Sequence, residues 1–218
     1  MMGVGECVVV VAPELFAPTA YYKVIASQGQ RAIVDTGLRY DKRRKSVHRY
    51  EIVDARGRLQ LTVPLGKPKD VVEKPTWHDT SVSTHDEWWR RHRTALESAY
   101  GRTPYFEFLI DRFDSVFRSP EEWSKWPSAI DLVRESNRII FELLAIDKDV
   151  AHTDSFDEQG VVDYRYRDIP KSPKPYWQVR EHLHGFQDGL SVLDLIFNMG
   201  PEAALYINPN RTSSRGRE

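Results

Sequence analysis

The chain has 218 residues, of which 40% are hydrophobic and 29% are charged, a balance that excludes a disordered or fibrous protein. Its 31 Lys and Arg nearly cancel its 32 Asp and Glu, leaving a net charge of -1, so charge gives no reason to expect nucleic acid or an anionic membrane as a partner. The single cysteine, Cys7, excludes an internal disulfide and an all-cysteine zinc site, and fits a reducing compartment. The longest apolar run, 7–12, is too short to span a membrane. We therefore expect a cytoplasmic protein with one domain over 1–207 and a flexible tail over 208–218.

The first 65 or so residues predict a small sheet. The run from Cys7 to Ala12 contains four valines and is typical of a strand buried on both faces, in which the cysteine thiol is also buried and unreactive. Thr19 to Ser27 has helical spacing, with Thr19 as the expected N-cap, and Arg31 to Asp35 predicts a second strand. This β-α-β opening requires a parallel or mixed sheet. Residues 48–53 and 59–65 predict a hairpin whose turn contains a glycine.

The rest of the chain is predicted to be mainly helical, apart from an irregular stretch between Ala145 and Pro175 whose proline-rich end, 170–175, could cover a site. The predicted helices are Asp86 to Tyr100, a segment that Pro104 opens and that includes Phe113, Ser128 to Leu144, Ser191 to Asn198, and Glu202 to Tyr206. The fold class is therefore α/β, or α+β if the early strands are antiparallel. A small mixed sheet from the N-terminal third packs with a mostly helical C-terminal part.

The densest cationic run in the chain lies just before the hairpin and consists of Arg39, Lys42, Arg43, Arg44 and Lys45. It could hold a phosphate or carboxylate, because arginine presents a planar donor fork. The alternative is a loop that faces water. Strand alternation places Arg49 on the same face as Val47 and opposite His48, so Arg49 is expected toward the interior or a cleft, where it needs an anionic partner.

The predicted helix 86–100 carries polar groups beside its apolar stripe. His92 lies near the centre of this stripe, Arg93 and Tyr100 flank it, and Glu97 is one turn beyond Arg93. A neutral imidazole can move a proton near pH 7, an arginine can neutralise developing negative charge, and a glutamate or tyrosine can orient a substrate hydroxyl. The alternative is structural: a satisfied core histidine, with Arg93 and Glu97 as an ordinary i, i+4 ion pair.

Other candidates are weaker. The histidines have no regular ligand spacing with any acidic residue, so we predict neither a metal site nor a cofactor. Asp194 and Asn198 are four residues apart on a predicted helix and could contact a ligand together. Asn198 is explained equally well by the end of the helix at Gly200-Pro201.

Several short motifs in order resemble a known family. They are Phe16-Ala17-Pro18-Thr19-Ala20-Tyr21-Tyr22, His48-Arg49, Leu61-Thr62-Val63-Pro64, His92-Arg93-Thr94 with Glu97 and Tyr100, Pro104-Tyr105-Phe106, and Leu190 to Asn198 before Gly200-Pro201. With these motifs the chain resembles the WbqC-like proteins of bacteria, and it departs from their usual pattern at Pro13-Glu14 and His48-Arg49. The family takes its name from surface-polysaccharide gene clusters. The resemblance therefore implies a role in making O-antigen-like glycans or their nucleotide-sugar precursors.

The leading hypothesis is a metal-independent transferase that joins an acyl, aminoacyl or amide group to an activated sugar or related anionic small molecule. His92 would act as general base, Arg93 and Arg49 would hold negative charge, and Glu97 or Tyr100 would orient the base. Further substrate contacts are expected from motif residues: Tyr22, Asp194 and Asn198. The hypothesis requires these side chains to share one cleft, and it predicts that His92→Ala abolishes turnover without unfolding the protein.

Two other functional classes stay open at this point. The first is a non-catalytic binding or scaffold protein for a glycan precursor or a partner enzyme. The second is nucleic-acid binding through residues 39–49, which the near-neutral charge disfavours.

Overall fold

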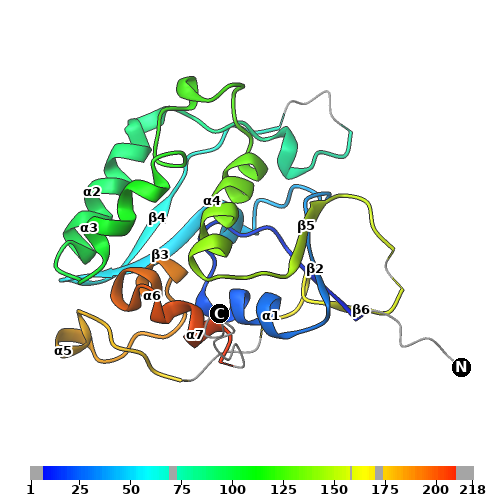
Figure 1. The fold of residues 1–218 in the computed structure, drawn as a ribbon. Helices are drawn as coiled ribbons and strands as arrows, with labels where there is room; N and C mark the ends of the chain where they lie inside the picture. The colour runs from blue at the N-terminus through cyan, green and yellow to red at the C-terminus, as the bar shows by residue number, and fades with distance from the viewer. Residues whose placement is uncertain (1–6, 69–72, 158, 170–173, 210–218) are drawn as a thin grey trace, which may run out of the picture.

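A four-stranded sheet forms one side of the molecule (Figure 1). The structure, a computed structural model, describes residues 7–68, 73–157, 159–169 and 174–209, so most of the predicted tail and of the proline-rich segment lies outside the described residues. The sheet order is β5-β2-β1-β6, and every neighbouring pair is parallel, as the predicted β-α-β opening requires. The strands are β1 (Val8–Val11), β2 (Arg31–Asp35), β5 (Asp149–Thr153) and β6 (Val161–Asp163).

The predicted hairpin forms a separate antiparallel sheet from β3 (Arg49–Asp54) and β4 (Gly57–Thr62). Gly57 has φ 120°, a conformation that side chains with a Cβ rarely adopt, so the turn needs a glycine there. One expectation was wrong. Val47 ends a turn of 3-10 helix over Lys45–Val47 and is not part of the strand, so strand alternation does not relate its direction to that of Arg49.

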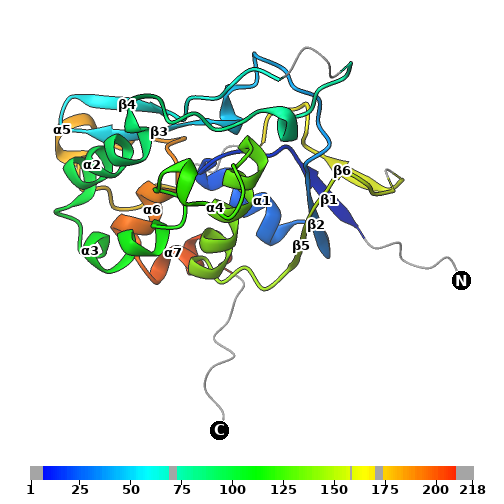
Figure 2. The ribbon, with the colours of Figure 1, turned by 90° about the horizontal axis from the view of Figure 1, so that it is seen from above.

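The helices gather on one side of the parallel sheet (Figures 1 and 2). The Ser191 hydroxyl caps α6, as the sequence predicted. Ser128 caps α4 through a reciprocal pair of hydrogen bonds with Asp131. The expected cap at Thr19 was wrong, because the N-cap of α1 is Pro18 and Thr19 is already the first helical residue. The predicted helix after Pro104 is only one turn, α3, and then tightens into a 3-10 segment over Ile110–Phe113. The helices are α1 (Thr19–Ser27), α2 (Trp88–Tyr100), α3 (Phe106–Leu109), α4 (Ala129–Leu143), α5 (Glu181–His184), α6 (Val192–Met199) and α7 (Glu202–Ile207).

One continuous core joins the sheet to the helices. Val9 and Val11 of β1 are fully buried, and so are Tyr22 and Ile25 of α1. Phe197 of α6 packs edge-on against neighbouring rings, with its centroid 5.0 Å from that of Phe106. Burial of each such side chain contributes about 1.5–3 kcal/mol of hydrophobic free energy. This packing fixes the positions of the strand ends.

The α/β class is confirmed, but two strands come from an unexpected place. β5 and β6 lie in the stretch after Ala145 that the sequence predicts to be irregular. Cys7 is another correction: it precedes β1 and is exposed, because the sheet covers only the residues that follow it. None of the helices in the described ranges has the length and apolar composition that crossing a bilayer requires.

Candidate functional site

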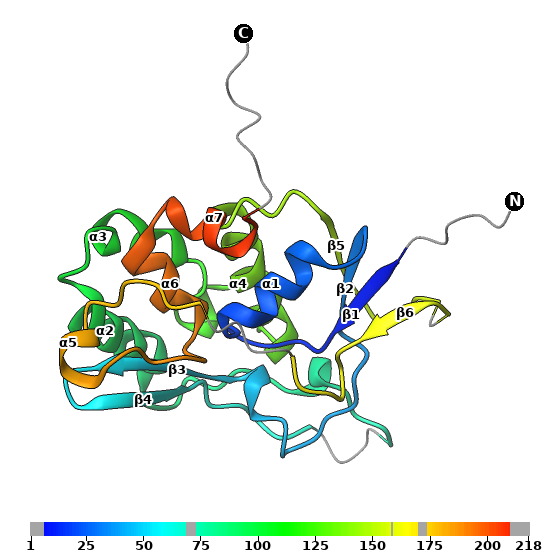
Figure 3. The same ribbon diagram turned by 90° about the horizontal axis from the view of Figure 1, so that it is seen from below.

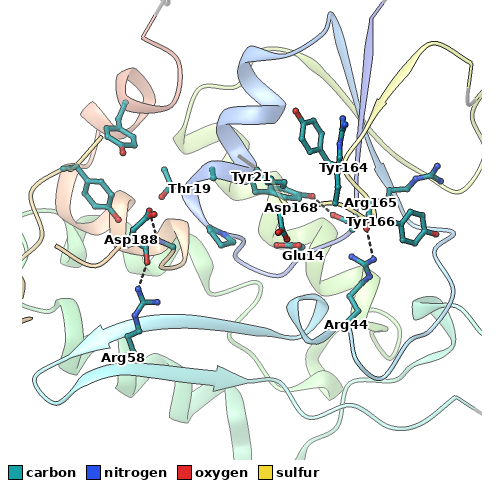
Figure 4. Close-up of a pocket in the computed structure, with 18 residues that line it drawn as sticks. Glu14, Thr19, Tyr21, Arg44, Arg58, Tyr164, Arg165, Tyr166, Asp168 and Asp188 are labelled. Atoms are coloured by element: carbon teal, nitrogen blue, oxygen red, sulfur yellow. Dashed lines mark hydrogen bonds between the residues drawn. The ribbon is translucent and has the colours of Figure 1, made fainter. Parts of the chain in front are cut away.

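The neighbouring strands β1 and β6 lie side by side in Figure 3. A cavity of about 1080 Å³ opens at the carboxyl edge of their sheet (Figure 4). Glu14 follows β1, and the segment 164–169 follows β6. From β1 the chain passes through α1 to β2 on one side, whereas β6 pairs with the other side of β1. Parallel sheets bind ligands at such a switch point, because the two chain directions leave a crevice between the strand ends. We call this space the main cavity.

Glu14 is a half-buried carboxyl group in the wall of the main cavity. The chain is held here by a hydrogen bond in which the Leu15 amide donates to the Ser46 carbonyl at 2.9 Å. Burial raises the pKa of Glu14 from 4.5 to about 7, and a hydrogen bond from the Ser46 side chain and the positive charge of Arg44 offset this only in part. Glu14 therefore exchanges protons near neutral pH, as a general acid or base must.

Arg44 brings positive charge to the same cavity. It is half-buried, whereas the other four cations of the run are exposed, so the solvated-loop alternative describes those four but not Arg44. Its Nη2 donates to the Arg165 carbonyl at 2.7 Å. No carboxylate among the described residues is within ion-pair distance of Arg44. Figure 4 shows Glu14 between Arg44 and Arg58.

Arg165 connects the strands on both sides of β1. Its Nη1 lies 2.8 Å from Asp35 at the end of β2, and its Nη2 lies 2.8 Å from Asp163 at the end of β6. The guanidinium of Arg165 holds the pKa of Asp163 below its usual value. Because two carboxylates already neutralise Arg165, we assign it to holding the cavity wall in place and not to ligand charge.

The amino end of α1 forms another part of the wall, through Pro18, Thr19 and Tyr21. The first turn has no acidic residue and no side-chain cap, so the positive end of the helix dipole acts toward the cavity. Tyr21 is held by a hydrogen bond in which its hydroxyl donates to the Ala12 carbonyl at 2.9 Å. The main cavity therefore combines a proton-exchanging carboxyl group with the positive potential of Arg44 and of the amino end of α1.

His92 lies away from this cavity, in the core between α2 and the hairpin. Only 4% of it is exposed. Its Nδ1 is 3.1 Å from the Tyr50 hydroxyl, and the backbone of Thr62 provides another hydrogen bond. Burial lowers the pKa of His92 from 6.5 to about 4. The imidazole is therefore neutral at pH 7 and enclosed by its packing partners.

The other predicted residues of α2 also have structural partners. Arg93 pairs with Asp111 at 2.5 Å and also with Asp114, and so not with Glu97, which is exposed. Tyr100 is fully buried, and its hydroxyl accepts a long hydrogen bond of 3.5 Å from a backbone amide. None of these side chains lines the main cavity.

Asp194 and Asn198, expected from their spacing to contact a ligand together, each form hydrogen bonds with the 176–179 segment. Asp194 accepts hydrogen bonds from the Tyr176 hydroxyl at 2.7 Å and from Gln178 at 2.8 Å. Asn198 accepts one from the Val179 amide at 2.9 Å. These bonds hold the 176–179 segment against α6. Because Tyr176 lines the main cavity, Asp194 affects the cavity through it.

Tyr22 and Arg49 complete the predicted set. The Tyr22 hydroxyl is buried and donates to Asn137 Oδ1 at 3.1 Å. Arg49 lines a hollow of about 230 Å³ that shares Glu14 and Pro18 with the main cavity, and its Nη1 donates to Gln60 at 3.2 Å. The structure thus places Arg49 beside the main cavity, but it does not bring Arg49, His92 and Arg93 into one hollow.

Sequence reasoning missed Glu14. It did not distinguish Arg44 from the other cations of the run, and it did not predict the two ion pairs of Arg165. A usable indication existed for Glu14, because a polar residue directly after a buried parallel strand belongs to the edge where α/β proteins bind ligands. In the part of the chain that the structure describes, no group of three or more His, Cys, Asp or Glu side chains is arranged to hold a metal ion.

The comparisons with known proteins agree with the resemblance of the motifs. The model of the WbqC-like protein family matches residues 13–161, a range that includes Glu14, Arg44 and Arg49. No curated protein matches the chain, and no solved structure does. The match spans most of the chain, from the end of β1 to the start of β6. The chain belongs to the WbqC-like protein family.

Proposed function

We propose that this protein is a transferase that modifies anionic nucleotide-sugar or glycan precursors of surface polysaccharides, with the main cavity as its active site. The family supports the substrate class, and the cavity supports the chemistry. The observation that carries the proposal is Glu14, a half-buried carboxyl group with a pKa of about 7 beside Arg44 and the amino end of α1. An acyl, aminoacyl or amide transfer needs a base of this strength near neutral pH.

In the proposed step, an amine or hydroxyl of the precursor attacks the carbonyl carbon of an activated acyl donor. The Glu14 carboxylate takes the proton of the nucleophile as the new bond to carbon forms. The carbonyl then re-forms, the bond to the leaving group breaks, and the Glu14 carboxylic acid returns the proton to the leaving group. The proton is thus conserved at Glu14, and this chemistry uses no metal ion.

Arg44 and the first turn of α1 would hold the negative charge of the precursor, because both present positive potential to the cavity. Arg49 would contact the second reactant from the adjoining hollow, which shares Glu14. Catalytic roles for His92, Arg93 and Glu97 stay predictions from the sequence. We favour Glu14 over His92 as the base because Glu14 borders open space.

The test is turnover with defined probes. The full chain is incubated with UDP-N-acetylglucosamine or a UDP-amino sugar, together with acetyl-CoA or an aminoacyl donor, and mass spectrometry records the product. Glu14→Gln should lower turnover by at least about 100-fold, the usual contribution of a general base. The matched control is Glu107→Gln on the exposed face of α3, which should retain activity. A product that Glu14→Gln forms at the same rate would remove Glu14 from the mechanism.

The second candidate function is binding without chemistry. The ion pairs of Arg165 support it, because they fix the cavity wall in place and involve no catalytic group. In this case UDP-sugars should raise the Tm of the protein and of Glu14→Gln equally, and no probe combination should give a product.

A further inference from the structure

A second cavity of about 500 Å³ lies between α4, β5 and the 123–125 segment. It shares no lining residue with the main cavity. Its apolar wall consists of Trp123, Phe141 and Val150, and Trp123 is held by Arg118, whose guanidinium lies 4.8 Å from the ring centroid. An aromatic wall of this kind fits a flat, apolar body.

The charged groups around the second cavity are paired, with one exception. Lys125 lies 3.5 Å from Asp131, and Arg138 lies 2.8 Å from Glu135. Arg134 also lines the cavity, and no carboxylate within the described residues lies at ion-pair distance from it. The rim therefore has one arginine whose charge is available to an anion.

His152 provides a second donor. The Tyr22 hydroxyl donates to Asn137 Oδ1, so Asn137 Nδ2 is the donor in its 3.1 Å contact with His152 Nε2. The imidazole must accept at Nε2 and carry its proton at Nδ1. Burial and the nearby charge of Arg134 lower the pKa of His152 to about 4, which keeps this tautomer neutral at pH 7. In the described part of the chain, the Nδ1–H has no hydrogen-bond partner.

We propose that the second cavity binds a small aromatic carboxylate, with its carboxylate between Arg134 and the Nδ1–H of His152 and its ring against Trp123 and Phe141. The carboxylate satisfies both donors at once, and the ring covers the apolar wall. A neutral ring lacks the first interaction, and a small inorganic anion lacks the second. This site is separate from the main cavity and does not depend on the proposed transferase activity.

The probe is benzoate, and the control ligand is benzyl alcohol, which has the same ring but no charge. The full chain, labelled with ¹⁵N-histidine, is titrated near pH 7, and the His152 resonances are assigned by comparison with His152→Gln. Benzoate should shift the His152 Nδ1 resonance saturably, whereas benzyl alcohol should not. Arg134→Gln, a change at an exposed position, should weaken benzoate binding by about ten-fold or more, because a charge-assisted hydrogen bond is lost.

The matched control is the double variant Glu135→Gln/Arg138→Gln, which removes one charge of each sign from the rim and leaves Arg134 in place. Its affinity for benzoate should stay within about two-fold of the parent chain, since surface ion pairs contribute little. Three outcomes would overturn the proposal. They are the absence of a saturable shift, equal shifts with benzyl alcohol, and equal weakening in the double variant and in Arg134→Gln.

Discussion

Two regions of this protein bury an ionisable side chain, and they do so with opposite consequences. At the carboxyl edge of the sheet, burial raises the pKa of Glu14 to about 7; between the hairpin and α2, burial lowers the pKa of His92 to about 4. In both places the low-dielectric surroundings disfavour the charged form. The pKa values shift in opposite directions because Glu14 is an acid and His92 is a base. The two regions also differ in open space, because Glu14 borders a cavity of about 1080 Å³ whereas His92 packs against Tyr50 and Trp88.

This contrast shows how a polar residue in a family motif can serve the fold. His92 and Tyr100 lie in one motif and Asn198 in another, yet each makes a buried or half-buried hydrogen bond to another part of the chain. Such bonds keep buried polar groups satisfied and fix how the elements pack. At the edge of the sheet, the polar groups of Glu14 and Arg44 face the cavity instead.

The comparison predicts that His92→Ala destabilises the fold. Removing the enclosed imidazole leaves a cavity and an unpaired Tyr50 hydroxyl, so the free energy of unfolding should fall by about 3 kcal/mol at neutral pH. Urea unfolding followed by tryptophan fluorescence measures this change. The loss should shrink as the pH falls from 6.5 toward about 4. In this range the unfolded chain binds a proton at His92 and the folded chain does not, so the parent chain progressively loses the stability that the neutral imidazole provides. A stable but inactive variant would instead support the catalytic role that the sequence predicted.

Glu14 should show the reverse pH dependence. Its pKa is higher in the folded chain than its usual value of 4.5, so the folded state binds more protons, and stability falls as the pH rises from 4.5 to about 7. Glu14→Gln removes this penalty. Relative to its effect near pH 5, the variant should gain about 2 kcal/mol of stability near pH 8, after a discount for the exposed part of the carboxyl group. Urea unfolding at the two pH values measures the gain; an equal effect at both would place the pKa of Glu14 near its ordinary value.

The parts of the fold that the sequence predicted are those with a local pattern. The valines of β1, the capping serine of α6 and the glycine of the hairpin turn each specify their element within a few residues. β5 and β6 could not be found in this way. They are short, and they become strands by pairing with β2 and β1, more than a hundred residues earlier in the chain.

The geometry of the candidate site could not be predicted for the same reason, because it depends on segments that are far apart in the chain. Burial raises the pKa of Glu14, whereas Ser46 and Arg44, about thirty residues later in the chain, lower it in part. Nothing in the local sequence marks these tertiary contacts. Arg44 differs from Arg43 by being half-buried, which composition does not reveal. The motif residues, by contrast, were visible in the sequence, but their hydrogen-bond partners were not.

Arg44 allows a test of whether the main cavity attracts anions. Arg44→Gln should weaken binding of inorganic pyrophosphate by about ten-fold, because it removes a charge-assisted contact. Isothermal titration calorimetry at constant ionic strength measures this affinity. Arg43→Gln is the matched control, since Arg43 is the neighbouring exposed arginine. If the two variants weaken binding equally, pyrophosphate is attracted by the basic run as a whole and not by the cavity.

The smallest expected effect belongs to Arg93. Its guanidinium bridges Asp111 and Asp114, joining α2 to the 3-10 segment after α3, with 37% of its side chain exposed. Arg93→Gln should therefore reduce the free energy of unfolding by only about 0.5–1 kcal/mol, and added salt should diminish the difference, because solvent and ions screen exposed pairs. Urea unfolding at low and high salt measures both quantities. A loss as large as that of His92→Ala, or one that salt does not change, would mean that Arg93 stabilises the buried core and not only the surface.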